Sequence, residues 1–303
     1  MTGIPGAAQA APGDILIVAA NGRSVSLPQV DFELHPELES ALRRVNIRTP
    51  HDVTARRLAD RRLLQPWVTS TPVAANSDFW PVFSARASRA RFLNTTARSI
   101  EELGFDLLPL LEMLGAPVDP APTTDVSFAT ASSVLPHFVA MRLRDRLLDK
   151  QVSNQDSPVI RAADAILDRC GTGPTEAERA LAMFQLGSHL ARFLTASELE
   201  KVWPRLEALP CFVTTSEVET NWLRLFKAVG RRQPDAMAAA AAPLLASESP
   251  SPDQRAYLVG AAVLGQLGAG NRDAARALWH KEPLRVTRSR SFAVALLAAH
   301  VGQ

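Results

Sequence analysis

From residue 125 to the C-terminus, apolar positions recur three or four residues apart, and short polar, proline- or glycine-containing connections separate the runs. This spacing puts the apolar side chains on one side of an α-helix, where they can pack against neighbouring helices. Glycine and proline mark where each helix stops. The pattern predicts helices over residues 130–150, 157–170, 175–193, 196–209, 216–230, 234–246, 252–268, 271–281 and 288–301.

Two of the predicted helical hairpins repeat each other. Trp222–Gly230, followed by Asp235, aligns with Gly260–Gly268, followed by Asp273, at an offset of 38 residues. We expect the glycine that ends each first helix to adopt a left-handed conformation and to cap that helix. Residues 258–279 also resemble a tetratricopeptide (TPR) repeat in their Leu-Gly…Gly…Ala pattern. A hairpin array is therefore predicted, with an irregular helical domain as the alternative.

The N-terminal third has a different pattern. Residues 14–20 (DILIVAA) are a continuous apolar run rich in isoleucine and valine, which is typical of a buried strand in a parallel sheet. Residues 69–85 are predicted as a loop that leads into an edge strand at 82–85. Three short helices are also predicted in this third, over residues 35–45, 49–64 and 99–114, the last of them kinked or divided by Pro109.

Together these patterns predict a mainly α protein with a small α/β segment on its N-terminal side. The α/β segment is a partial Rossmann-like unit, and the helices after it form an array of TPR-like hairpins. Three prolines in ten residues make 115–124 the linker between the two parts. The predicted organisation is a flexible N-terminus, the α/β segment, the linker and the α-helical repeat-like domain, at residues 1–13, 14–114, 115–124 and 125–303.

The composition describes a chain that can bury a core and stay in water. Hydrophobic residues make up 47% of it and charged residues 21%, and no apolar run approaches the ~20 residues of a membrane-spanning helix. Residues 1–13 lack the basic and apolar regions of a secretory signal. The two cysteines, Cys170 and Cys211, are predicted as small buried hydrophobic residues in a reducing compartment. The predicted location is the cytoplasm, with no transmembrane segment in this chain.

Positive charge is concentrated before residue 99. Eleven arginines lie between Arg43 and Arg98, against three aspartates, although Lys+Arg total 33 and Asp+Glu 31 over the whole chain. The segment has few interleaved aromatic residues and no recognised binding motif, so no nucleic acid is expected as a partner. A solvated helix surface is the expected role, and a surface for an acidic partner or an anionic membrane face is the alternative.

The usual signatures of catalysis are missing from the sequence. The six histidines lack metal-ligand spacing, and Ser132 and Ser133 lack the Gly-x-Ser-x-Gly turn of a hydrolase nucleophile. Gly171 and Gly173 follow a predicted helix rather than a strand, so they are interpreted as a helix cap and turn. No catalytic residue, no metal ligand and no cofactor are predicted.

One motif carries a resemblance to a known family. Residues 76–81 (NSDFWP), read with the strand at 14–20 and the two helices between, resemble the end of the catalytic domain of large bacterial spermidine synthase-like proteins. In that family an Asn-Thr-Asp-Asp-x-Pro motif leads into the final strand of a Rossmann-like sheet. The resemblance covers about residues 13–94 and makes Asn76, Asp78 and Pro81 family-motif residues. The alternative is an Asx-turn and a proline stop before an edge strand.

The resemblance implies the C-terminal segment of a spermidine synthase-like (polyamine aminopropyltransferase-like) protein. The family's glycine-rich turn for the nucleoside, its ribose-binding acid and its catalytic aspartate would precede residue 14, so this chain is not expected to be catalytic alone. Its expected partner is a missing N-terminal domain or another protein. Some members of the family carry an N-terminal membrane region, and a longer protein of that kind would be attached to the membrane. The alternative function is a helical-repeat interaction module, with Trp222 and Trp279 in a candidate partner groove, although core packing is the favoured role of each tryptophan.

Overall fold

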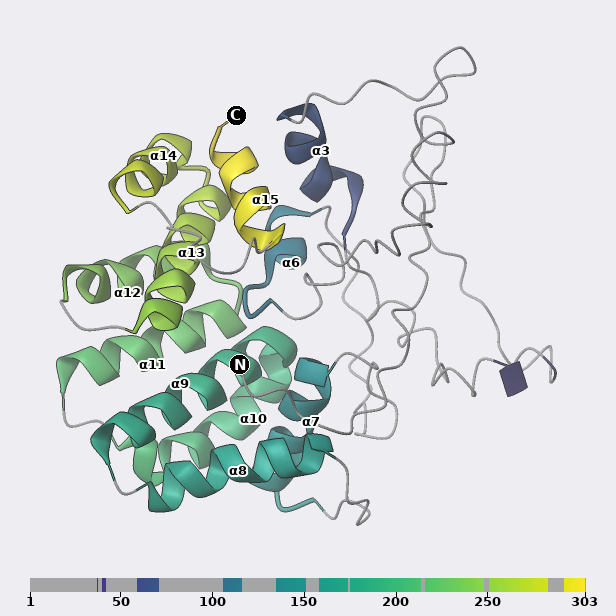
Figure 1. Ribbon diagram of the computed structural model, residues 1–303, viewed down its shortest axis with the longest axis vertical. Coiled ribbons are helices and arrows are strands. Elements are labelled where there is room, and N and C mark those ends of the chain that lie inside the picture. The colour runs from purple at the N-terminus through teal and green to yellow at the C-terminus, as the bar shows by residue number, and fades with distance from the viewer. Residues whose placement is uncertain are drawn as a thin grey trace, which may run out of the picture.

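The computed structural model describes residues 37, 40–41, 59–70, 106–115, 135–150, 158–173, 175–213, 216–247, 251–282 and 292–302. All regular secondary structure in these ranges is helical (Figure 1), which confirms the mainly α fold class. The predicted strands at 14–20 and 82–85 lie outside the described residues. No strand occurs in the part of the chain that is described, so the α/β segment stays a prediction.

The described helices fall into two groups. Two short helices precede residue 116, and the others follow residue 134. Their bounds are α3 (Arg61–Ser70), α6 (Leu110–Leu114), α7 (Leu135–Leu147), α8 (Pro158–Thr172), α9 (Glu176–Phe193), α10 (Ala196–Glu207), the 3-10 helix η4 (Pro210–Phe212), α11 (Glu217–Gly230), α12 (Pro234–Ala246), α13 (Pro252–Gly268), α14 (Arg272–Lys281) and α15 (Phe292–Val301).

Helix starts in the array follow local capping chemistry. At the start of α9, the Thr175 hydroxyl accepts from the Glu178 N–H, and the Glu178 carboxylate accepts from the Thr175 N–H. The same reciprocal arrangement starts α10, α11 and α13. Each capping box satisfies two N–H groups that the helix itself leaves unpaired, so these starts agree with the sequence pattern within one residue.

The N-terminal helices depart from the predicted bounds. A helix was expected over 49–64 and a loop from 69, but α3 continues to Ser70. Its start is fixed by Asp60, whose carboxylate accepts a hydrogen bond from the Leu63 N–H at 2.8 Å. An N-cap at Asp60 requires a new helix to begin there, which the apolar spacing alone did not indicate. Of the expected 99–114 helix, residues 106–109 are not helical and α6 begins directly after Pro109, whereas residues 99–105 lie outside the described residues.

The two repeated hairpins have the same turn, but not through the glycines expected. Gly230 and Gly268 are the last helical residues, and the left-handed positions lie two residues later, at Arg232 (φ 54°) and Gly270 (φ 81°). Gly268 is needed for close approach instead, since a Cβ there would lie 3.0 Å from a Pro234 ring carbon. The expectation of left-handed caps at these two glycines was therefore wrong.

The hydrophobic core joins both groups of helices. Leu63 of α3 and Leu110 of α6 are buried with the array residues in one continuous cluster. At the C-terminal end of the array, α3 packs on α15: the rings of Trp67 and Phe292 meet edge to face with centroids 4.9 Å apart. The His300 Nε2 donates to the Leu63 carbonyl oxygen at 2.9 Å. The linker between the groups lies almost wholly outside the described residues, so the domain boundary stays a prediction.

An aromatic cluster holds α9, α11 and α13 together. The Phe184 ring meets the rings of Trp222 and Tyr257 edge to face, with centroids 5.5 and 5.4 Å apart. Phe226 lies against the same rings and is fully buried. Gly187 of α9 faces Phe226, and a Cβ at that glycine would overlap the phenyl ring. Glycine here lets α11 approach α9 closely enough to bury the cluster.

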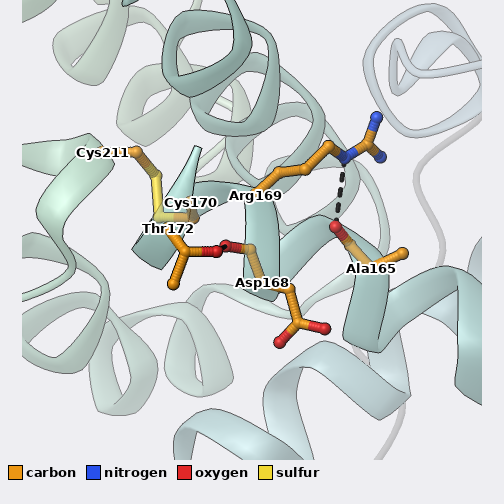
Figure 2. Close-up of a disulfide and its surroundings, with 6 residues drawn as sticks. All are labelled: Ala165, Asp168, Arg169, Cys170, Thr172 and Cys211. Atoms are coloured by element: carbon orange, nitrogen blue, oxygen red, sulfur yellow. Dashed lines mark hydrogen bonds between the residues drawn. A yellow bond between two sulfur atoms is a disulfide. The ribbon is translucent and has the colours of Figure 1, made fainter. Parts of the chain in front are cut away.

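The two cysteines form a disulfide, which corrects their interpretation as reduced hydrophobic residues. Cys170, in the last turn of α8, is bonded to Cys211 of η4, with Cα atoms 4.9 Å apart (Figure 2). Arg169 and Thr172 beside it donate to the carbonyls of the preceding turn, at Ala165 and Asp168. The disulfide could not be predicted from sequence spacing, because the two cysteines are 41 residues apart. Only the packing of η4 on α8 brings them together. Cysteine content therefore gives no support to a cytoplasmic location, which stays a prediction.

Candidate functional site

Of the site residues predicted from the sequence, only Trp222 and Trp279 lie among the described residues. Asn76, Asp78 and Pro81 lie outside the described residues, so their family role stays a prediction. Trp222 is 7% exposed in the aromatic cluster of α11, whereas Trp279 is half-buried on α14. The printed ring contacts of Trp222 are made with Phe184, Phe226 and Tyr257. Whether a partner contacts either tryptophan also stays a prediction.

One contact surface in the described residues is formed with a short segment of the chain itself. Residues 106–115, which include α6, lie against α13 on the side away from α12 and α14 (Figure 1). We call the residues that receive this segment the acceptor face. The acceptor face consists of Arg192 on α9, Arg232 in the turn between α11 and α12, and Tyr257, Gly260 and Gly268 on α13.

The apolar part of the contact depends on long apolar side chains of the segment that lie over glycines of α13. Leu108 is 6% exposed, and a Cβ on Gly260 would lie 2.7 Å from its Cδ1 atom. Met113 lies over Gly268 in the same way, because a Cβ there would be 3.1 Å from the Met113 Cε. Leu110 is buried beside them. The two glycines thus leave room for the long side chains of the segment.

The segment is shaped by its own ends. The Asp106 carboxylate accepts a hydrogen bond from the Leu108 N–H at 2.8 Å, which turns the chain before Pro109. The Gly115 N–H donates to the Leu111 carbonyl at 2.9 Å and closes the single turn of α6. These local bonds present one side of residues 108–114 to α13.

The charged part of the contact pairs Glu112 with Arg192. The Arg192 Nη1 donates to the Glu112 Oε1 at 2.5 Å. The Glu112 side chain is 40% exposed and that of Arg192 only 14%, so the carboxylate lies at the rim and the guanidinium beneath it. Loss of hydration opposes ionisation of Glu112, but Arg192 and then Arg232 outweigh it and hold the pKa of the carboxyl below its usual value.

Arg232 joins two helix ends beside this ion pair. Its guanidinium donates to the carbonyls of Ala191 at 2.6 Å and Arg192 at 2.8 Å, at the end of α9. It also donates to Val229 and Gly230, both at 3.0 Å, at the end of α11. Burial lowers the pKa of Arg232 to about 10, against the attraction of Glu112. A cation at two helix C-termini opposes the negative ends of both helix dipoles and supplies additional donors to their last carbonyls.

Two donors of the acceptor face have no hydrogen-bond partner. They are the Tyr257 hydroxyl and the Arg192 Nε, and both atoms are buried. Burial raises the pKa of Tyr257, and the nearby Arg232 only partly opposes the rise, so the phenol stays protonated. The acceptor face therefore has more hydrogen-bond donors than Glu112 uses.

Other polar groups in the described residues serve the fold. Arg144 is 1% exposed and donates to Asp145 at 2.9 Å and to Glu198 at 2.6 Å, which ties α7 to the start of α10. In the described ranges, no group of three or more His, Cys, Asp or Glu residues could hold a metal ion. None of the helices described is both long and apolar enough to cross a membrane.

Sequence reasoning did not single out Glu112, Arg192, Arg232 or Tyr257. Each occupies an ordinary position in its own segment, and the helices that bring them together are 80 or more residues away from Glu112. The one local signal was the leucine-rich, acidic composition of 106–114 (DLLPLLEML). Comparison with protein-family models, curated proteins and solved structures finds no match to this chain.

Proposed function

We propose that residues 125–303 form a TPR-like helical array that works as a protein-interaction module, with the acceptor face as its binding surface. One observation carries the proposal: the acceptor face already holds a short leucine-rich segment, residues 106–115, through Leu108 and the Glu112–Arg192 ion pair. Apolar side chains of a short helix seated on a helical surface are a recurring mode of peptide recognition.

The repeated turn supports the hairpin-array interpretation. Three hydrogen bonds at the end of α11 recur 38 residues later at the end of α13: Arg231 N–H to Lys227 corresponds to Ala269 N–H to Gly265, and the next two residues follow suit. Arrays of this kind present the exposed sides of successive helices as one continuous surface. Burial of each large apolar side chain of a bound segment contributes about 1.5–3 kcal/mol before the cost of ordering the segment.

The binding test uses the full chain with its own segment released. In the opened variant, Leu108→Asn and Leu110→Asn remove the two apolar anchors without adding charge. A fluorescein-labelled peptide of residues 104–116 (GFDLLPLLEMLGA) should bind this variant with a saturable rise in anisotropy. Wild-type protein should bind about tenfold more weakly or less, because its acceptor face is occupied.

Two controls define the outcome. The surface change Leu181→Asn, at a leucine 42% exposed on α9, should behave as wild type toward the peptide. A scrambled peptide of the same composition should not bind the opened variant. The opened variant must keep its helical circular dichroism and cooperative melting. If such a folded variant does not bind the 104–116 peptide, the acceptor face is not a binding surface.

A second proposal rests on the N-terminal sequence. We propose that residues 13–94 are the end of a spermidine synthase-like catalytic domain, supported by the order of strand, two helices and the NSDFWP motif. The family's nucleoside-binding and catalytic motifs are not among the 303 residues, so we expect no activity from this chain alone. Incubation with putrescine and decarboxylated S-adenosylmethionine, beside an active aminopropyltransferase as control, should yield no spermidine, and product above background would contradict the proposal.

A further inference from the structure

We infer that Arg192 and Arg232 bind a carboxylate on the bound segment, so that the partner is an acidic, leucine-rich segment of another protein. Glu112 fills this position within the chain. The inference rests on the proposed function and adds the class of ligand. Its pattern is Leu-x-Leu-x-Glu-x-Leu, as in residues 108–114.

Charge complementarity supports this ligand class. Residues 106–115 carry two acids, Asp106 and Glu112, and no basic residue. The acceptor face opposes them with two guanidinium groups, Arg192 and Arg232. The Arg232 guanidinium donates to four backbone carbonyls, and these bonds fix its position. Because the carbonyls carry no net charge, the positive charge of Arg232 can still attract a neighbouring carboxylate. A face without its segment would leave the Arg192 guanidinium without its carboxylate partner, which favours an acidic replacement.

Hydrogen-bond donors without a partner also support a carboxylate as the ligand. Glu112 approaches Arg192 through Nη1 alone, and the Arg192 Nε has no partner although it is buried. A guanidinium can bind a carboxylate through Nε and one Nη together, in a planar two-bond arrangement. Tyr257 is 6% exposed, and its hydroxyl is a further donor without an acceptor. A segment of another protein is not constrained by the chain that connects Glu112 to the array. Such a segment can therefore form hydrogen bonds with donors that residues 106–115 leave without a partner.

The leucines set the position of the acid. Leu108 anchors the segment against Gly260 of α13, and Leu110 and Leu114 are also buried. Glu112 lies between these anchors and at the rim, where its carboxylate reaches Arg192 of α9.

The test varies the acid of the peptide against the opened full-length variant. Relative to the 104–116 peptide, the peptide with Glu112→Gln should bind about tenfold more weakly, and the peptide with Glu112→Lys should not bind measurably. Arg192→Glu in the opened variant should reverse this order and prefer the lysine peptide. Arg205→Glu, at an arginine 63% exposed on α10, is the matched control and should leave the order unchanged.

The outcomes separate the two proposals. If the glutamine peptide binds the opened variant as tightly as the glutamate peptide, the acid is not read, while the interaction module stands. If neither peptide binds a folded opened variant, the proposed function itself fails. A second release variant, Glu112→Arg in the full chain, keeps every leucine and should also admit the glutamate peptide, because it opposes Arg192 with a like charge. Failure of this variant to bind more peptide than wild type would count against carboxylate reading.

Discussion

Arg232 and Gly270 hold the same left-handed backbone conformation at equivalent positions of two hairpin turns, 38 residues apart. Glycine accepts this conformation without cost, whereas a side chain at φ near +55° costs about 1–2 kcal/mol. No atom would lie within 4 Å of a Cβ added to Gly270. Glycine is therefore favoured at this turn by its backbone conformation and not by lack of space. Arg232 repays the cost by donating to carbonyls of both α9 and α11.

Arg232→Gly should therefore destabilise the protein although it removes backbone strain. The variant loses the bonds to Ala191 and Arg192, which lie at a buried helix end, and we expect a net loss of about 1–3 kcal/mol. Denaturant unfolding followed by circular dichroism measures it. Gly270→Ala is the companion change and should cost about 1 kcal/mol from the backbone alone. A neutral or stabilising Arg232→Gly would show that the guanidinium does not hold the helix ends.

The helix bounds of the array were largely predictable from the sequence, and the physical reason is that their signals are local. Thr175 and Glu178 make a capping box from residues three apart, and proline at the first position starts α12 and α13. The left-handed Arg232 was not predictable, because arginine is an unusual residue there and its compensation comes from carbonyls about forty residues away.

Gly187→Ala should be among the more harmful single changes in the described residues. The added Cβ would overlap the ring of Phe226, which is fully buried in the aromatic cluster and cannot move aside. We expect a loss of about 1–3 kcal/mol from overpacking. Gly171→Ala is the matched control: it is exposed within α8 with nothing near its Cβ, so it should stabilise the helix by up to about 1 kcal/mol. Thermal melting of the two variants should shift in opposite directions.

The Cys170–Cys211 disulfide should contribute measurably to stability. It closes a loop across α9 and α10, and cross-linking such a loop typically stabilises a protein by about 2–4 kcal/mol. The Cys170→Ser/Cys211→Ser double variant should unfold at lower denaturant, and a dithiol reductant should lower the midpoint of wild type but not of the double variant. Equal midpoints for wild type with and without reductant, together with two titratable thiols, would show that the bond does not form.

The acceptor face shows why a binding surface of this kind escapes sequence reasoning. Glu112 sits in a leucine-rich run that reads as one side of an amphipathic helix, and Pro109 marks only a break in it. The partners of that run are two glycines on α13 and an arginine at the end of α9, and no sequence motif marked any of them as a contact for residues 106–115. The tertiary packing of α9 and α13 alone makes them one surface.

Stability should fall as the solution is acidified below neutral, because of two histidines. Burial lowers the pKa of His189 and of His300, against the carbonyls of Gln185 and Leu63 that accept from them. In the unfolded chain both rings take up a proton near pH 6.5, but in the folded chain only at lower pH. Between these values the unfolded state binds more protons, so the free energy of unfolding decreases with falling pH.

The lowered pKa of Glu112 acts in a separate pH range, because its contribution to stability is lost only below about pH 4.5. Denaturant unfolding between about pH 7 and about pH 5 should show the loss due to the histidines in wild type. The His189→Gln/His300→Gln variant should show a flatter profile, whereas His280→Gln, at an exposed position of α14, should keep the wild-type slope. A double variant as steep as wild type would assign the pH dependence to other groups.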